Sequence, residues 1–245
     1  ADGCSYTRQT GNLGRQFSPR ISLSYALNEH WSLNGNLGRY YQLPAYTTLG
    51  YADADGRLLN KQTETGYIAS NHYVAGLEFR PVRTTVMTLE GFYKTYDHYP
   101  VSLIDSIALA NKGTDYVAVG DEPVIPVGKG RAYGIEFMLR TQDFYGVVAA
   151  LTYTWYRSEF KALKRELETT SRYIPSNWDN RHIFTLTATR KVGRHWDLGI
   201  KWRYVAGGPY TPYDVETSSR IEAWEAKRQP YYDYSRFNTC RLPAF

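Results

Sequence analysis

The feature that most constrains this chain is an alternation of apolar and polar residues that recurs in many separate segments. Between residues 196 and 204, apolar side chains at every second position are interleaved with Asp197, Lys201 and Arg203. The same period of two runs through residues 21–27, 31–37, 73–80 and 132–140. Because successive side chains of a β-strand point to opposite faces, the pattern predicts strands with one apolar face and one polar face.

These segments are longer than most strands of globular sheets. They indicate about eight strands of roughly 10 to 15 residues, enough to cross a hydrocarbon layer when tilted. The expected connections alternate between very short turns, at 28–30, 81–83, 142–144 and 193–194, and long loops, at 42–66, 98–129, 159–177 and from 207 onward. Tight turns at one rim and long loops at the other are typical of outer-membrane barrels.

Composition excludes membrane-spanning helices. Mean hydropathy is -0.51, and the longest apolar run, Val147–Leu151, is far shorter than the roughly 20 residues that a spanning helix needs. Tyrosine is instead abundant, with 23 copies. Amphipathic rings suit the lipid–water boundary. Rings of this kind lie near the ends of the apolar strand faces at Tyr25, Trp31, Tyr73, Tyr93, Tyr133, Trp155, Trp196 and Tyr204.

We therefore predict an all-β fold, an antiparallel transmembrane β-barrel fragment. A soluble sandwich also has two-faced strands, but its strands are shorter. A kelch-like propeller blade places four short strands in the length that holds two long ones here. Small polar residues such as Ser24, Asn34 and Thr154 suit a wide lumen, and an open sheet edge cannot lie in lipid. We expect further strands beyond this chain.

The distribution of charge along the chain and the spacing of the cysteines predict neither a nucleic-acid partner nor a cofactor. The net charge of +5 is spread along the chain without a block of like charges. Cys4 and Cys240 lack the spacing of a zinc site. They either form a disulfide with each other or are two unrelated thiols. Asp53, Asp55 and Gly56 begin like a calcium loop without its later ligands, which favours a simple turn. We expect no metal site.

Two runs of residues resemble one family of membrane barrels. The first is Gly130–Glu136, with the sequence GRAYGIE, which is similar to a strand opening in TonB-dependent outer-membrane receptors. The second runs from Asn177–His182 through a turn at Gly193 to Gly207–Pro212, and resembles the late barrel of the same family, particularly its Bacteroidota-type members. The resemblance covers roughly residues 17–212 and implies the C-terminal half of a barrel of about 22 strands.

The resemblance implies a bacterial outer-membrane location and active uptake of a scarce ligand, such as a siderophore, cobalamin or an oligosaccharide. Residues 1–245 then form a partial TonB-dependent receptor β-barrel domain, without the plug domain and the remaining strands. The implied partners are outer-membrane lipid, the transported ligand, and the energy-transducing TonB complex acting through the absent plug. A passive porin is the alternative, together with a small structural, adhesive or enzymatic barrel.

The sequence predicts no catalytic residues. Asp97 with His98, and Asp179 with His182, are the candidate pairs for acid–base chemistry. Neighbours on a strand point to opposite faces, and the chain has no nucleophile elbow, so these pairs are poorly placed to cooperate. We expect a protein that is not an enzyme.

Candidate site residues fall into three groups. Tyrosines that flank the first and last long loops either stack on a ligand or pack the loops: Tyr40, Tyr41, Tyr46, Tyr51, Tyr210 and Tyr213. Charged residues on the polar strand faces are expected to face the lumen, where they line a path, hold a plug or contact water: Glu78, Arg80, Glu136, Arg140, Lys201 and Arg203. Asp179, Arg181 and His182 form a dense polar cluster, for which the resemblance suggests a structural role.

Overall fold

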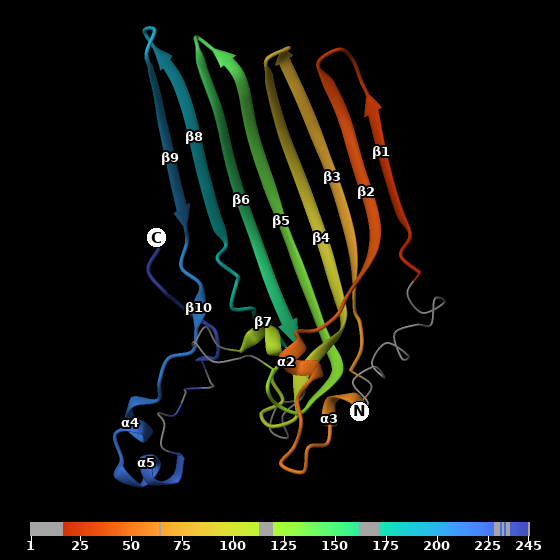
Figure 1. The fold of residues 1–245 in the computed structure, drawn as a ribbon, viewed down its shortest axis with the longest axis vertical. Helices are drawn as coiled ribbons and strands as arrows, with labels where there is room; N and C mark the ends of the chain where they lie inside the picture. Colours follow the sequence, from red (N-terminus) through yellow and green to blue (C-terminus); the bar gives the residue numbers. More distant parts are fainter. Residues whose placement is uncertain are drawn as a thin grey trace.

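A computed structural model describes residues 17–63, 65–112, 120–161, 172–227, 231, 233 and 236–244, which form one long antiparallel sheet and a cap of loops and short helices at one end (Figure 1). The long strands pair in chain order, each with the next. They are β1 (Arg20–Ala26), β2 (Trp31–Gln42), β3 (Ile68–Val82), β4 (Thr85–Ser102), β5 (Val124–Phe144), β6 (Val147–Lys161), β8 (His182–Val192) and β9 (Trp196–Val205). The three-residue β7 (Tyr173–Pro175) pairs with the end of β6.

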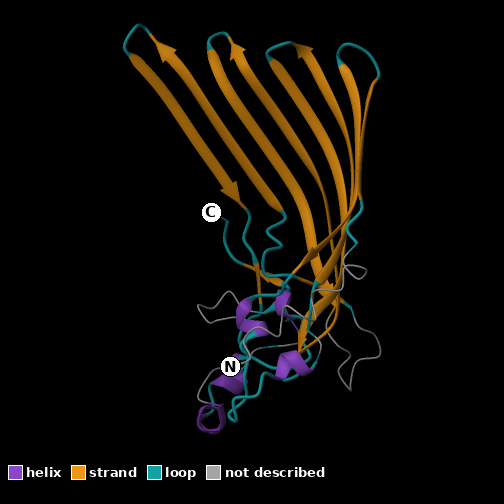
Figure 2. Ribbon diagram, turned by 45° about the vertical axis from the view of Figure 1, so that its right-hand side comes forward, coloured by secondary structure: helices purple, strands orange, loops and turns teal. Residues whose placement is uncertain are grey.

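The predicted all-β class and antiparallel barrel-type sheet are confirmed. The strands range from 7 to 21 residues, longer than most strands of globular sheets. Within the described residues the sheet is open, with β1 at one edge and β9 at the other. Figure 2 shows all long strands running side by side, with tight turns at one end and the helical cap at the other. The predicted segregation of short turns and long loops to opposite rims is thus confirmed.

Two predicted connections are displaced from their positions in the structure. The turn expected at 142–144 lies instead at Tyr145 and Gly146, whose φ angles are 53° and 76°. A two-residue hairpin needs positive φ at both central residues, and the Asp143 carboxylate accepts a hydrogen bond from the Gly146 amide at 2.9 Å. The turn expected at 81–83 lies one residue later, because β3 continues to Val82.

The second long loop is shorter than predicted. The strand pair continues past a register shift near His98, whose φ is 60°, so that β4 reaches Ser102 and β5 begins at Val124. Bulges bend a strand without ending its pairing, and their local loss of alternation makes a sequence read as loop. The turn predicted around Asp53 is present, with the Asp53 carboxylate accepting hydrogen bonds from the amides of Asp55 and Arg57.

The register sorts apolar side chains onto one face, which we call the apolar face. One unbroken row of cross-strand partners on this face consists of Tyr25, Leu33, Leu77, Leu89, Phe137, Tyr153, Phe184 and Tyr204. Large side chains here are uncovered, such as Trp196 at 72% and Leu198 at 59% exposure. A soluble sandwich buries this kind of face against a second sheet. The only second sheet in the described residues is the two-stranded pair β10 (Pro209–Tyr210) and β11 (Cys240–Arg241).

The buried core lies where the loop ends of β4 and β6 meet the cap. Val101 and Phe160 of these strands form a cluster with Ala108 and Ala110 of the loop that follows β4, and Tyr96 and Tyr99 lie beside it. The cap also holds the short helices α2 (Tyr46–Leu49), α3 (Leu59–Gln62), η2 (Leu109–Asn111), α4 (Val215–Ser218) and α5 (Ile221–Lys227). No helix among the described residues is long and apolar enough to span a membrane.

Gly134 on β5 provides a test of the close strand packing. A Cβ at this position would lie 2.3 Å from the carbonyl oxygen of Trp155, whereas at Gly91 on β4 the nearest atom is 4.0 Å away. We expect Gly134→Ala to lower the free energy of unfolding of the complete barrel by about 1–3 kcal/mol, because the β5–β6 backbone must move apart. Urea unfolding in detergent micelles measures this. Gly91→Ala is the matched control, and equal losses in both variants would contradict the register.

Candidate functional site

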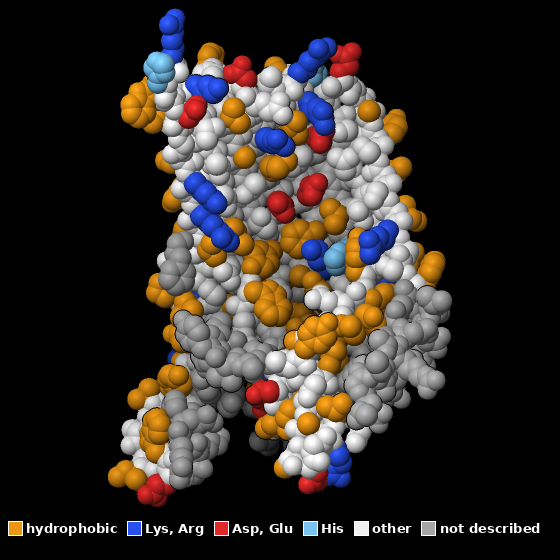
Figure 3. Space-filling model, in the orientation of Figure 1, with side chains coloured by type: hydrophobic (Ala, Val, Ile, Leu, Met, Phe, Trp, Pro, Cys, Tyr) orange, Lys and Arg blue, Asp and Glu red, His pale blue; other side chains and the backbone are white. Residues whose placement is uncertain are grey.

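The face opposite the apolar face, here called the polar face, carries charges in the middle of the long strands. Figure 3 shows acidic and basic side chains of both signs spread over the sheet on the side toward the viewer. By register, the six charged residues predicted from the sequence share this face: Glu78, Arg80, Glu136, Arg140, Lys201 and Arg203. They extend from β3 to β9, so the charged wall spans most of the sheet.

Two carboxylates lie next to each other on the polar face. Glu90 of β4 and Glu136 of β5 are direct cross-strand partners. Within the described part of the chain, no ion pair joins either carboxylate to a basic side chain, whereas Glu78 is held by Arg80 with an Nε–Oε1 distance of 2.6 Å. Like charges directly opposite each other on a sheet are destabilising, so this pair favours a cation or water in front of it.

The depth of the carboxylate pair is fixed by the aromatic rows on the apolar face. Glu136 adjoins Ile135, which lies between the ring of Tyr133 on the loop side and the stacked pair Trp31–Phe79 on the turn side. If such rows mark the two lipid–water boundaries, the pair lies at hydrocarbon depth. Charges at that depth face protein or water, not lipid.

Toward the loop rim, the polar face becomes aromatic. The Tyr40 ring lies 4.3 Å from the His72 ring and carries the Arg20 guanidinium 4.3 Å above its centroid. Tyr96 and Phe160 have their centroids 5.4 Å apart, and Tyr99 packs on Phe160 at 4.5 Å. Phe160 is buried in the core, whereas the partly exposed Tyr40 and His72 rings beside Arg20 can bind a large ligand by stacking and by cation–π contact.

The six candidate tyrosines are not gathered into one cluster. Tyr40 lies on the polar face, but Tyr41 alternates to the apolar face, where the Arg39 guanidinium lies 5.4 Å from its ring. Tyr46 is 86% exposed on α2. Tyr51 lies in the first long loop, and Tyr210 and Tyr213 lie beyond β9, across the sheet from β2.

Sequence reasoning missed the residues that depend on long-range pairing. Glu90 is one acid in a weakly alternating segment, and only the β4–β5 register places it against Glu136. His72, Tyr96 and Phe160 were likewise not singled out. Each stands at an alternate position of its strand that points to the polar face, and this alternation was the one sequence signal that could have identified it.

The predicted polar cluster around Asp179 is a buried ion-pair network. Asp179 is fully buried, and its Oδ1 accepts a hydrogen bond from the Ser158 amide at 3.0 Å. Its Oδ2 lies 2.7 Å from Nη2 of Arg241 and 3.4 Å from Nε of Arg157. His182 instead contacts Tyr153, with 2.9 Å between Nδ1 and the hydroxyl. The Asp179 contacts join β6, the loop before β8 and the C-terminal segment, in line with the structural role suggested above.

Asp53 and Arg181 lie outside the membrane-spanning strands and have shifted pKa values. The Arg57 amide, which donates to the Asp53 carboxylate, is the main cause that holds the pKa of Asp53 below its ordinary value. Burial lowers the pKa of Arg181, and the neighbouring charges of Arg241 and Arg157 lower it further. The lowered pKa of Asp53 favours the ionised carboxylate that accepts the hydrogen bonds of the turn. The lowered pKa of Arg181 reflects its burial and the positive charges beside it.

The described residues contain no group of three or more His, Cys, Asp or Glu side chains that could hold a metal ion. Within the described residues Cys240 forms no disulfide, and its Sγ lies 3.1 Å from Nη2 of Arg236. Cys4 lies outside the described residues.

Comparison with known proteins gives a consistent family signal. The sequence matches the family model described as TonB dependent receptor-like, beta-barrel, over residues 3–238. No curated protein matches the chain.

Several solved outer-membrane receptors are similar in structure. The ferripyoverdine receptor of Pseudomonas aeruginosa is 15% identical with a TM-score of 0.55, and the match covers 81% of this chain and 24% of that one. The ferric-catecholate import receptor Fiu from E. coli K12 is 16% identical with a TM-score of 0.54, covering 78% and 24%. The ferric yersiniabactin uptake receptor FyuA from Yersinia pestis is 13% identical with a TM-score of 0.51, covering 78% and 26%. The chain thus spans about a quarter of the length of these receptors, with which it shares the fold.

Asp179 provides a test of the ion-pair network. Asp179→Asn removes the carboxylate that Arg157 and Arg241 share, and we expect a local loss of about 1.5–3 kcal/mol, the usual worth of a hydrogen bond to a charged group. Hydrogen exchange at the amides of Ser158 and Leu242 in the complete barrel measures it. Asp53→Asn, in an exposed turn, is the control. Unchanged protection in Asp179→Asn would show that the network is not needed.

Proposed function

Because this chain belongs to the TonB-dependent receptor-like β-barrel family and lies in the bacterial outer membrane, we propose that it forms part of the wall of a receptor that actively imports a scarce ligand. The energy comes from the inner-membrane TonB complex and acts through a plug domain inside the barrel. The proposal concerns the complete receptor, to which this chain contributes barrel strands.

In this proposal the apolar face contacts lipid and the polar face lines the lumen. Exposed leucine, isoleucine and tryptophan side chains fit acyl chains, while the charged wall from Glu78 to Arg203 requires water or protein. The six charged residues named above are then lumen-facing. Full charges at this depth suit a wide lumen better than a small barrel filled by its own side chains.

The observation that carries the proposal is the adjacent pair Glu90 and Glu136. Two carboxylates in direct register on the polar face need a compensating cation. A guanidinium from a domain seated inside the barrel can accept both, since it presents several donors in a planar fork. We therefore place the plug against β4 and β5. In a passive porin, water would solvate the pair instead.

Ferric siderophores are the first candidate ligands. The similar receptors bear names that refer to ferripyoverdine, ferric catecholate and ferric yersiniabactin. The aromatic and cationic mouth around Arg20, Tyr40 and His72 suits large ligands with aromatic or anionic groups. Tyr46, Tyr51, Tyr210 and Tyr213 remain candidate loop contacts. Cobalamin and oligosaccharides are the other ligand classes to test, and the proposal includes no catalytic step.

Uptake by cells tests energy coupling. We expect cells that carry the complete receptor to accumulate one of three probes, a radiolabelled ferric siderophore, cobalamin or an oligosaccharide, only when the TonB complex is intact. Loss of the complex should reduce accumulation to the level of cells without the receptor, because binding alone does not concentrate a ligand. Equal accumulation with and without the complex would favour a passive porin.

The carboxylate pair has its own test. We expect Glu90→Gln with Glu136→Gln to weaken seating of the plug, so that energised uptake falls and passive entry of a small antibiotic rises. The control, Glu29→Gln with Asp197→Asn, removes two carboxylates near the short-turn rim. Antibiotic sensitivity and probe uptake are measured in the same strains. If only ion selectivity changed, and entry did not, the pair would face water rather than a plug.

A further inference from the structure

A group of basic residues lies on the loop side of the aromatic row, partly on the apolar face by register and partly joined to it through the ion pairs of Asp179. We call it the outer basic cluster, and it consists of Lys129, Arg131, Arg157, Lys161, Arg181 and Arg241. Arg131 of β5 pairs in register with Glu159 of β6, and Lys161 pairs with Tyr173 of β7. The Arg131 guanidinium lies 4.0 Å above the Tyr173 ring and the Lys161 ammonium 4.8 Å from it. Two cations are thus held on one ring, with Arg131 also 5.6 Å from the Tyr133 ring.

The cluster has more positive than negative charge. Four guanidinium groups, those of Arg131, Arg157, Arg181 and Arg241, share two carboxylates. Glu159 receives Arg131 at 2.8 Å and Arg157 at 2.6 Å, and Asp179 receives the rest. Lys129 and Lys161 add two more cations, and Asp97 of β4 adds one more acid on this face. Among the described residues, six cations against three carboxylates leave a surplus of three positive charges.

Two of the guanidinium groups also have an unused donor. The Nε atoms of Arg157 and Arg181 are buried and lie 3.4 and 4.0 Å from Asp179 Oδ2, but neither makes a hydrogen bond in the described part of the chain. Yet the side chains of the cluster are not sealed off, since that of Arg131 is 35% exposed and that of Arg181 41% exposed. A partly exposed cluster with surplus guanidinium charge is a site for an anion with several oxygen acceptors.

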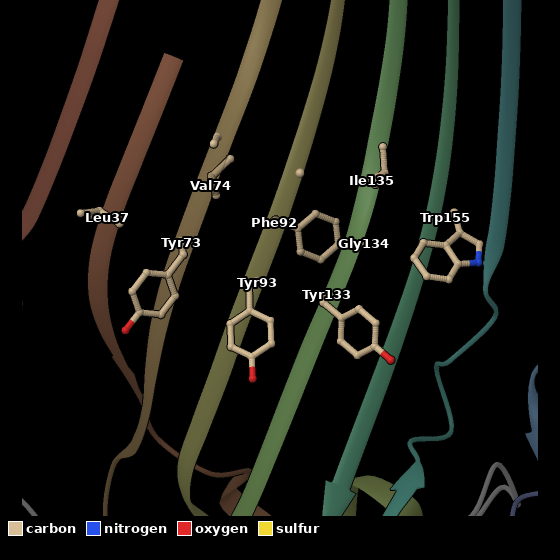
Figure 4. A pocket seen from close by; sticks show the side chains of 11 residues that line it. Leu37, Tyr73, Val74, Phe92, Tyr93, Tyr133, Gly134, Ile135 and Trp155 are labelled. Atoms are coloured by element: carbon tan, nitrogen blue, oxygen red, sulfur yellow. The ribbon is translucent and has the colours of Figure 1, made fainter. Parts of the chain in front are cut away.

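The level of the cluster selects which anion reaches it. Tyr73, Tyr93, Tyr133 and Trp155 form a row with centroid spacings of 6.4, 6.4 and 6.3 Å. Figure 4 shows this row, with the hydroxyl groups of Tyr73 and Tyr93 pointing toward the loop end of the sheet. Arg131 lies two residues from Tyr133 on the side nearer the loops, and Arg157 lies two residues from Trp155 on the same side. In a barrel whose long loops are external, the cluster lies at the headgroups of the outer leaflet.

An apolar depression adjoins the cluster on the membrane side. It has a volume of about 490 Å³, and its walls include Tyr73, Tyr93, Tyr133, Ile135 and Trp155, with Ala75 and Gly91 as its floor. Tyr133 belongs to this wall and also contacts Arg131 of the cluster. A ligand held here can therefore have an anionic head at the arginines and an acyl chain along the depression, which a free anion does not use.

We propose that the outer basic cluster binds the phosphate groups of an outer-leaflet lipid, whose acyl chain lies in the depression below Tyr133. Arginine binds phosphate oxygens in a bidentate manner, and basic pockets on membrane proteins bind anionic headgroups. The ring contacts to Tyr173 hold Arg131 and Lys161 in place before the lipid arrives. This site is on the outside of the wall, and it depends on the membrane orientation but not on which ligand is imported.

The test uses the complete receptor, purified in a neutral detergent, and native mass spectrometry. Three probes are added separately: diphosphoryl lipid A, the same lipid without its phosphates, and inorganic phosphate. We expect the diphosphoryl lipid to bind at least about tenfold more tightly than either of the others, which corresponds to one charge-assisted contact. Equal binding of the dephosphorylated lipid, or of free phosphate, would overturn the proposal.

Variants separate charge from folding. Arg131→Gln with Lys161→Gln should weaken binding of the diphosphoryl lipid about tenfold or more, whereas Arg131→Lys with Lys161→Arg should retain most of it. Lys129→Gln with Lys161→Gln leaves the ion pairs of the cluster intact and should still weaken binding if the first variant misfolds. Arg190→Gln with Lys191→Gln, two exposed cations near the opposite rim, is the matched control. Binding that stays unchanged in both neutralised variants, or an equal loss in the control, would refute the site.

Discussion

The structure depends on one constraint, that backbone amides and carbonyls of a strand in lipid must pair with neighbouring strands. Here each long strand pairs with the next in chain order, so the register is continuous from β1 to β9. One row of side chains, from Tyr25 to Tyr204, crosses the whole sheet without changing face. A slip of one residue at a strand would move its polar face, with any charged side chains, into the apolar face, which lipid does not tolerate. The sorted faces therefore hold the register, and the register in turn fixes every position discussed above.

The same constraint brings opposite chemistries close together. Ile135 and Glu136 are consecutive residues, yet one faces the apolar side and the other lies beside a second carboxylate at Glu90. One sheet can therefore present apolar contacts on one face and strong charge on the other at equal depth. Since the β-bulge near His98 comes only beyond this region, the strands remain regular around Ile135 and Glu136. The polar face and the apolar face are consequently two sides of one structural feature.

Local alternation was sufficient to predict the strands, the two faces and the polarity of the rims, because side-chain parity is a property of a single strand. It placed Glu78, Glu136 and Lys201 on one face, as the register has them. The adjacency of Glu90 to Glu136 depends on which residues of β4 and β5 lie opposite each other, and these strands are joined by a long loop and shifted in register near His98. The contact between Asp179 and Arg241 joins residues far apart in sequence within irregular segments. Neither the Glu90–Glu136 adjacency nor the Asp179–Arg241 contact can be predicted from the alternation of apolar and polar residues.

Irregular segments at the loop rim meet the demand for hydrogen bonds in another way. They have no ladder, so buried backbone groups are paired by side-chain amides. Asn60 donates to the carbonyls of Thr48 and Glu122 and accepts from the Val124 amide. Asn111 and Asn238 both donate to the carbonyl of Pro175, and Asn238 also to that of Asn111. These asparagines join loops that follow different strand pairs, so the cap acts as one layer. Because β7 belongs to that layer and carries Tyr173, the cap also positions Arg131 and Lys161 at the outer rim of the wall.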